Sequence, residues 1–390
     1  MNPSASGWIH KLQNIISSDS RFLNYHRDEF YTDLKKCGFI YGSNIRVVKN
    51  IIGNNDLTNE ELSKINLFLA LQHTYVKSEI TKPLTESLIS FYKEIKVHKA
   101  SFFGAIINGK ISDSTLERII HKRVQIDDNI LTKNFNYFVI NALLFADVLA
   151  YQYYLKTNSI DHVYVKHLES SIETIVLKTL NSKTHKTIHD QSLIKLVEAS
   201  LRYQDNLNLT YSEAVSNLNS EFEKWYIFDI ACMATWSDRN IDSNEQLFLQ
   251  ELGNDLGLDS HITAQSIDAV NEFYSKHEDN IALLSSSNIV KNFYDNSSIL
   301  VGKLISRNKR RLQKELEQSK ELVRLIGQST IRDLDENEQK QLQEQLLDII
   351  KTIPSLAIFI LPGGALLLPL FVKFIPKLLP SSFDDNRVED

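Results

Sequence analysis

Several oxygen-bearing side chains lie close together past the middle of the chain: Asp238, Asn240, Asp242 and Glu245. Asp229 precedes them on a predicted apolar helix. Hard divalent cations such as Ca²⁺ and Mg²⁺ bind clusters of oxygen ligands of this kind. These five residues are therefore the candidate metal ligands, and a divalent cation is the one cofactor that the sequence suggests.

The same turn also has a purely structural interpretation. Asp242 and Glu245 have the spacing of a helix-capping box, and Asp238 has the position of an Asx-turn residue. An EF-hand is excluded, because Ser243 and Leu249 stand where that loop needs glycine and glutamate. The cation site and the capped turn remain alternatives.

Nucleophilic catalysis has no support in the sequence. The Gly-x-Ser-x-Gly and Gly-x-Gly-x-x-Gly motifs are absent, and Cys37 and Cys232 have no histidine-paired context. His185 and His189 have the i, i+4 spacing of zinc ligands, but no third ligand is identified and their surroundings are polar. No catalytic residue is assigned, and the chain is not expected to be an enzyme.

The composition is that of a folded, moderately acidic protein. The 390 residues are 43% hydrophobic and 24% charged, with a net charge of −6, which excludes dominant disorder and argues against DNA as a partner. Two cysteines cannot form a disulfide scaffold and suit a reducing compartment. No signal peptide is recognisable in the first residues.

Helical periodicity positions these residues. Apolar residues recur at i, i+3, i+4 and i+7 up to about residue 350, and the strand candidates are limited to 45–48 and 162–165. Five capping boxes mark helix starts: Thr58 with Glu61, Ser114 with Glu117, Thr210 with Glu213, Asp242 with Glu245, and Asp335 with Glu338. We therefore expect an all-α protein with a helical bundle at 1–205, a helical domain at 206–300 and a C-terminal region at 301–390.

A basic amphipathic stretch opens the C-terminal region. Its leading members are Lys303, Arg307, Lys309, Arg310, Arg311 and Lys314. Basic residues just before a membrane segment set its orientation and bind anionic lipid. RNA is the alternative partner, but residues 303–324 contain no aromatic side chain on which bases could stack. Membrane lipid is therefore the first expectation.

Residues 352–372 contain no charged side chain and are long enough to span a bilayer core as a helix. This proline-rich membrane segment and its continuation contain Pro354, Pro362, Gly363, Gly364, Pro369, Pro376 and Pro380. The glycine pair would let two helices approach closely, which makes a homo-oligomer a candidate. Asp348 lies just before the segment, where we expect an interfacial or helix-end contact rather than an ion site. The alternative is a hydrophobic tail packed on the protein itself.

The order of these C-terminal motifs resembles a known family. Asp348–Pro354, the spaced prolines and Leu379–Phe383 (LPSSF) resemble the membrane segment of the leucine-zipper and EF-hand transmembrane (LETM-type) proteins. Asp333–Glu338 resembles the family's lead-in to that segment, so the similarity covers about residues 305–384. The resemblance implies inner-membrane proteins of mitochondria linked to cation/proton exchange and ribosome contact, with bacterial relatives linked to biofilm formation.

Two departures from the family pattern bear on function. The family usually carries an acidic residue between its second and third prolines, where this chain has Ala365. Exchange would need an intramembrane proton carrier, and residues 352–372 contain no acidic side chain. The ribosome-contacting domain that normally follows the segment is expected to be missing, since the sequence ends at Asp390.

Residues 225–258 carry a second resemblance. An apolar helix, a short acidic turn and a capped helix ending in Leu256-Gly-Leu258 resemble the tellurite-resistance TerB-like helical domain. Arg239 replaces the glycine that the family has in this turn.

Together these features predict a membrane-anchored helical scaffold or interaction protein, linked by resemblance to biofilm or envelope physiology. We expect it in the bacterial inner membrane, with its N-terminal part in the cytoplasm. A cation/proton exchanger subunit is the first alternative. A soluble scaffold that binds a ribosome or another protein partner is the second.

Overall fold

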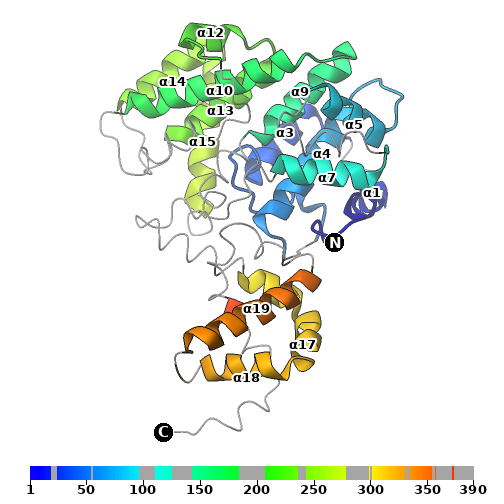
Figure 1. Ribbon diagram of the computed structural model, residues 1–390. Coiled ribbons are helices and arrows are strands. Elements are labelled where there is room, and N and C mark those ends of the chain that lie inside the picture. The colour runs from blue at the N-terminus through cyan, green and yellow to red at the C-terminus, as the bar shows by residue number, and fades with distance from the viewer. Residues whose placement is uncertain are drawn as a thin grey trace. The chain divides into compact units, whose positions relative to one another are not determined.

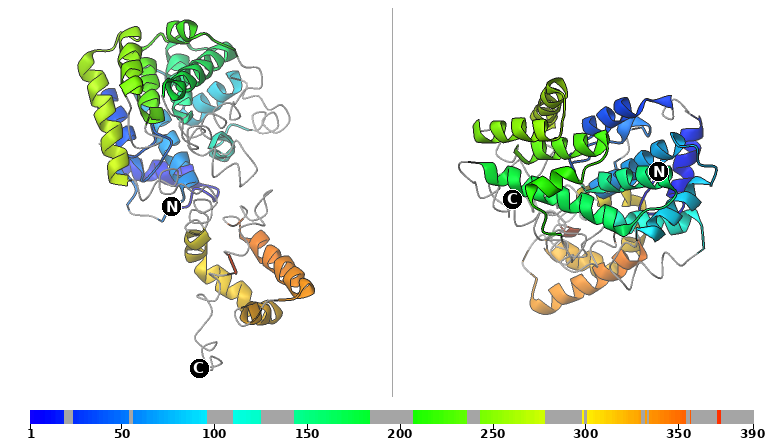
Figure 2. Two further views of the ribbon diagram at one scale, coloured as in Figure 1. Left: turned by 90° about the vertical axis from the view of Figure 1, so that its left-hand side faces the viewer. Right: turned by 90° about the horizontal axis from the view of Figure 1, so that it is seen from above.

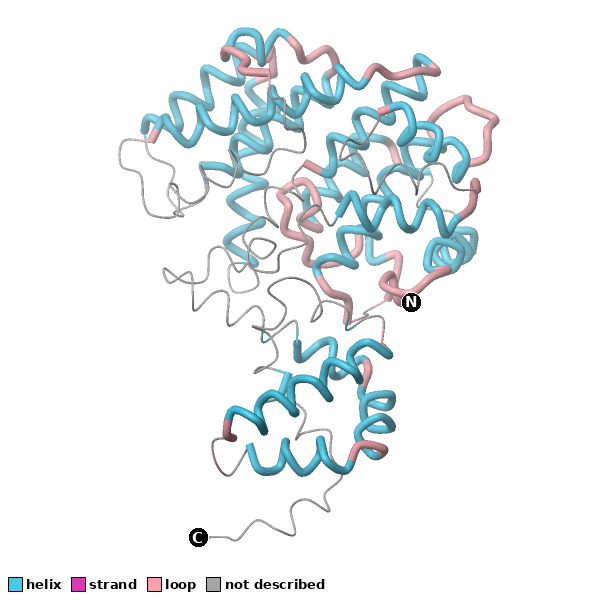
Figure 3. Tube along the Cα trace, in the orientation of Figure 1, coloured by secondary structure: helices cyan, strands magenta, loops and turns pink. Residues whose placement is uncertain are grey.

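The computed structural model consists of helices and their connections over the residues that it describes (Figure 1; Figure 3). The description covers residues 1–18, 24–53, 56–95, 110–124, 143–183, 207–235, 243–277, 298, 301–329, 332, 334–353, 356 and 371–372. The expected all-α class is confirmed for this part of the chain. Both strand candidates are wrong, because residues 45–48 form a loop that enters a short 3₁₀ helix and residues 162–165 form the first turn of a long α-helix.

The chain divides into two compact units. Unit 1 comprises residues 1–55, 59–126 and 135–287, and unit 2 comprises residues 56–58, 127–134 and 288–390. The helices of unit 1 are α1 (Trp8–Ser18), α3 (Arg27–Lys36), η1 (Val48–Asn50), α4 (Asn59–Val76), α5 (Leu84–Glu94), α7 (Asp113–Val124), α9 (Leu144–Thr157), α10 (His162–Ser182), α12 (Tyr211–Ser216), α13 (Glu221–Thr235), α14 (Ser243–Asp255) and α15 (Ser260–His277). Those of unit 2 are α17 (Lys309–Glu317), α18 (Lys320–Ser329) and α19 (Glu336–Thr352).

Unit 1 is built around helices that are apolar on nearly every side. The consecutive residues Leu67–Leu71 of α4 are all buried, because α4 packs against both α7 and α9. Helix α13 is enclosed in the same way by α10, α14 and α15. A helix that is hydrophobic all round must be surrounded by other helices, which explains the weak amphipathic pattern of these segments.

The predicted boundary at residue 205 falls inside unit 1. Helix α10, on the N-terminal side of that boundary, packs against α12 and α13 on the other side. The helices expected in two domains therefore share one packed unit. The division into domains at 1–205 and 206–300 stays a prediction.

A buried ion pair joins α7 to α9 in unit 1. The guanidinium of Arg123 on α7 donates to both carboxylate oxygens of Asp147 on α9, with Nε 2.7 Å from Oδ2. The Tyr92 hydroxyl donates to the same carboxylate at 3.2 Å. The side chains of Arg123 and Asp147 are 3% and 0% exposed. Each charged group therefore has the other as its polar partner in place of water.

Two of the expected capping boxes are confirmed and one is wrong. Thr210 with Glu213 and Asp335 with Glu338 both make the reciprocal pair of hydrogen bonds. Ser114 is not a cap, because α7 starts at Asp113 and Glu117 instead accepts hydrogen bonds from the backbone of residues 7 and 9.

Unit 2 is a small group of helices (Figure 2). It has its own hydrophobic core. Helix α18 packs against both α17 and α19. The buried core residues are Val301, Leu304, Ile305, Leu312, Leu316, Leu322, Leu325, Ile326, Leu334, Leu342, Leu346, Ile349, Ile350, Ile353, Leu356 and Phe371. The core thus includes Leu356 and Phe371, which belong to the uncharged stretch 352–372.

Candidate functional site

The candidate metal ligands are only partly within the described residues. Asp238, Asn240 and Asp242 lie outside them, so the predicted cation site stays a prediction. Asp229 and Glu245 are described, and both are fully buried. Over the described part of the chain, no group of three or more His, Cys, Asp or Glu side chains is arranged to hold a metal ion.

Asp229 faces helix α3. Its Oδ2 accepts a hydrogen bond from the Tyr31 hydroxyl at 2.7 Å, and its Oδ1 lies 3.4 Å from the ammonium of Lys35. Burial, together with the nearby carboxylate of Asp229, raises the pKa of Tyr31 well above its ordinary value, so the phenol stays protonated as a donor. Both oxygens of Asp229 are therefore engaged in joining α3 to α13.

Glu245 pairs with Lys183, the residue that follows α10. The ammonium lies 3.5 Å from Oε1, and the two side chains are 1% and 0% exposed. A protein cation therefore already stands beside this carboxylate. The sequence did not reveal the pair, because 62 positions separate its members.

Both cysteines are buried in unit 1. Burial raises the pKa of the Cys37 thiol to about 12 and that of Cys232 well above its ordinary value. Both thiols are therefore protonated near neutral pH, which makes them poor nucleophiles.

A pocket of about 240 Å³ lies beside the start of α10. Its lining includes Asp161, Tyr164 and Glu223. Asp161 caps α10 by accepting from the Val163 amide, and Glu223 accepts from the Tyr164 hydroxyl and two backbone amides. These acidic groups already serve the local fold.

The basic stretch divides into two groups. Lys303 and Arg307 point toward residues 56–58, which belong to the same unit: Lys303 Nζ lies 3.8 Å from an Asp56 carboxylate oxygen and 3.3 Å from the Leu57 carbonyl. The remaining members, Lys309, Arg310, Arg311 and Lys314, are exposed on α17. The second group is therefore the more exposed of the two, and its expected contact with lipid stays a prediction.

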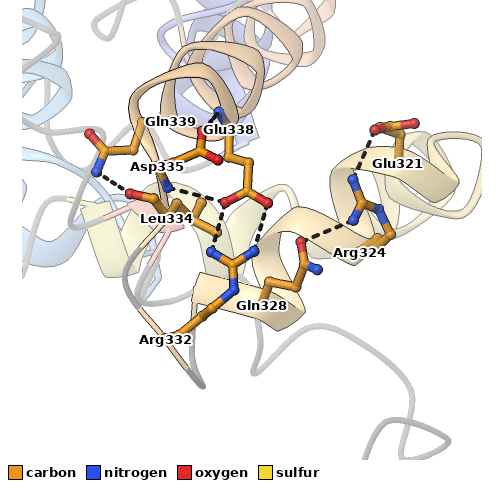
Figure 4. Close-up of polar contacts among 8 residues, drawn as sticks. All are labelled: Glu321, Arg324, Gln328, Arg332, Leu334, Asp335, Glu338 and Gln339. Atoms are coloured by element: carbon orange, nitrogen blue, oxygen red, sulfur yellow. Dashed lines mark hydrogen bonds and ion pairs between the residues drawn. The ribbon is translucent and has the colours of Figure 1, made fainter.

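The turn between α18 and α19 is held by charged groups (Figure 4). Arg332 donates to the two carboxylate oxygens of Glu338 at 2.7 and 2.8 Å, and Glu338 also accepts from the Asp335 amide at 3.1 Å. The hydrogen bonds from the Arg332 side chain have the largest effect on the pKa of Glu338. Together with the bond from the Asp335 amide, they lower it to about 2. The carboxylate is therefore ionised over the whole physiological range.

Asp348 lies on the exposed side of α19. Its Oδ1 is 2.8 Å from the Lys351 ammonium, one turn later on the same helix. The two side chains are 74% and 59% exposed. The interfacial or helix-end role expected for Asp348 stays a prediction.

The predicted membrane segment is mostly outside the described residues. Its glycines and all of the prolines named for it fall there: Pro354, Pro362, Gly363, Gly364, Pro369, Pro376 and Pro380. Among the helices that are described, none is long and apolar enough to cross a membrane.

The C-terminal region is similar to known proteins. Residues 334–390 match the family model described as "LETM1-like, RBD". The chain is 45% identical over 68 residues to the mitochondrial proton/calcium exchanger protein of Drosophila melanogaster, and 42% identical over 55 residues to the mitochondrial LETM1 domain-containing protein mdm28 of Schizosaccharomyces pombe. These alignments cover 17% and 14% of this chain but only 6% and 12% of the relatives. No solved structure matches.

These comparisons support the LETM-type resemblance and correct the expected location. The relatives are named as mitochondrial proteins, so the expected location in the bacterial inner membrane was wrong. The match at 334–390 includes α19 and the whole uncharged stretch 352–372. The TerB-like resemblance of residues 225–258 and the link to biofilms lie outside this match and stay predictions.

Proposed function

We propose that this chain is a LETM-type helical scaffold that is anchored in a membrane through residues 352–372. The observation that carries the proposal is the family match over residues 334–390, which includes this uncharged stretch. Helix α19 leads directly into the stretch, and the relatives are named as mitochondrial proteins. Unit 1 would then be the part that binds partner proteins.

Carbonate extraction of membranes from cells that make the full chain tests the anchor. The test variant carries Ile360→Arg and Leu367→Arg, because each arginine in a bilayer core costs about 2.5–3.5 kcal/mol of insertion free energy. The matched control carries Ile111→Arg and Leu247→Arg, two apolar side chains that are already 54% and 56% exposed in unit 1. We expect the unaltered chain and the control to stay in the pellet and the test variant to be released. Release of the unaltered chain would contradict the anchor.

A cation/proton exchanger is the second candidate. It is supported by the name of the Drosophila relative, which is 45% identical over 68 residues. Residues 352–372 offer no acidic side chain to carry a proton, which is why the scaffold is preferred. The full chain in proteoliposomes with a Ca²⁺ gradient should give no pH change, and a Ca²⁺-driven pH change would favour the exchanger.

A further inference from the structure

We propose that Arg310, Arg311 and Lys314 of α17 form a docking surface for anionic phospholipid headgroups. This surface lies outside the region matched by the family model. The inference rests on the proposed membrane association and adds to it a lipid class and the residues that recognise it.

The three side chains share one face of α17. At 100° per residue, Arg310, Arg311 and Lys314 fall within an arc of about 100°, centred opposite the direction of Leu312 and Leu316. Leu312 and Leu316 are buried in the core of unit 2, and the three basic residues are exposed. The core therefore fixes the orientation in which α17 presents its charges.

Within the described part of unit 2, these three cations have no carboxylate partner, in contrast to three other cations of the unit. Arg324 pairs with Glu321 at 3.1 Å, Arg332 with Glu338 at 2.7 Å and Lys351 with Asp348 at 2.8 Å. Figure 4 shows the first two of these pairs. By contrast, within the described residues no carboxylate pairs with Arg310, Arg311 or Lys314, although Glu315 and Glu317 lie on the same helix. Their charge remains available for an external anion.

The partner that fits best is an anionic bilayer. Each basic residue near such a surface contributes about 1 kcal/mol of binding free energy, without a need for specific geometry. Residues 301–329 contain no aromatic side chain, so the surface has no platform for stacking the bases of a nucleic acid. The uncharged stretch 352–372, which is the proposed anchor, belongs to the same unit as α17.

Flotation of the purified full chain with vesicles tests the proposal. One set of vesicles contains phosphatidylcholine alone, and the other contains phosphatidylcholine mixed with phosphatidylglycerol. The test variant carries Arg310→Gln, Arg311→Gln and Lys314→Gln. The matched control removes the same three charges from exposed positions of unit 1, through Arg46→Gln, Arg118→Gln and Lys156→Gln.

We expect the unaltered chain and the control to prefer the anionic vesicles, and the α17 variant to lose roughly a hundredfold of this preference. The preference should also weaken at high salt, because exposed charges are screened. If the unaltered chain binds both vesicle types equally and the α17 variant behaves the same, membrane association stands and the docking surface is wrong. If the unaltered chain binds neither vesicle type, both proposals fall.

A single-stranded RNA, poly(U), provides the competing probe at the same ionic strength. The docking surface is also wrong if the α17 substitutions abolish binding of poly(U) while binding to anionic vesicles is unchanged. Loss of vesicle binding in the α17 variant alone supports the lipid surface.

Discussion

Arg332 and Glu338 form a bidentate ion pair across the turn that joins α18 to α19. The same carboxylate accepts a hydrogen bond from the Asp335 amide, so one side chain both caps α19 and binds the arginine that precedes it. Leu334, between them in the sequence, is buried in the core of unit 2. The ion pair therefore fixes the point at which the matched region 334–390 joins the rest of its unit.

This pair predicts a pH dependence for unit 2. The folded state lowers the pKa of Glu338 from 4.5 to about 2, so its stabilising effect is complete above pH 4.5 and disappears as the pH falls toward 2. Glu338→Gln should speed amide hydrogen exchange in the first turn of α19 at pH 7, and the difference from the unaltered chain should shrink as the pH falls through that range. Amide hydrogen exchange of the first turn of α19, measured between pH 7 and pH 3, checks it.

Glu321→Gln is the control for this prediction. Glu321 also pairs with an arginine, Arg324, but both side chains are more than half exposed and no capping amide is involved. Its effect should be small, as for most exposed ion pairs. An equal loss of protection in both variants would show that the cap contributes nothing beyond an ordinary surface pair.

Local sequence patterns predicted parts of this turn well. The capping box at Asp335 and Glu338 depends on residues three positions apart, and so does the box at Thr210 and Glu213. The same rule failed for Glu117, whose carboxylate accepts from the amides of Gly7 and Ile9. More than one hundred positions separate these groups, and a single sequence carries no signal of such contacts.

Contacts between distant residues were equally unpredictable in the basic stretch and among the candidate metal ligands. The sequence identified the basic stretch, but it could not tell which of its cations were free. Lys303 lies beside Asp56, 247 positions away, whereas Arg310 is exposed on a helix whose apolar face is buried. Likewise, the acidic character of Glu245 was evident, but its burial against Lys183 was not.

The buried pair of Arg123 and Asp147 predicts a large loss of stability when one member is removed. Arg123→Met should lower the free energy of unfolding of unit 1 by about 3–5 kcal/mol, because it leaves a buried carboxylate without its cation. Combining it with Asp147→Leu should restore part of the loss, since no buried charge remains. Urea denaturation followed by circular dichroism measures both variants.

Arg118→Met is the control for this pair, because Arg118 lies on the same helix but is exposed. We expect its effect to stay within about 0.5 kcal/mol. If the double variant is less stable than Arg123→Met alone, the ion pair contributes through packing rather than through charge compensation.

The contacts of Asp229 with Tyr31 and Lys35 lead to a prediction about the candidate cation site. If the turn at 238–245 binds Ca²⁺ or Mg²⁺, Asp229 should not be a ligand, because Tyr31 and Lys35 already occupy its oxygens. Calorimetric titration of the full chain carrying Asp229→Asn should then match that of the unaltered chain, whereas Asp238→Asn should weaken binding. Loss of cation binding in Asp229→Asn would contradict this assignment, and the absence of heat in the unaltered chain at millimolar metal would remove the site altogether.

The burial of Phe371 predicts that the uncharged stretch contributes to the stability of unit 2. Phe371 is fully buried among the core residues of that unit, so Phe371→Ala should lower its free energy of unfolding by about 3–5 kcal/mol. The loss should appear as faster amide hydrogen exchange along α18 and α19, with no change along α4 of unit 1, which serves as the internal control. Unchanged exchange along α18 and α19 would mean that Phe371 does not stabilise the core of unit 2.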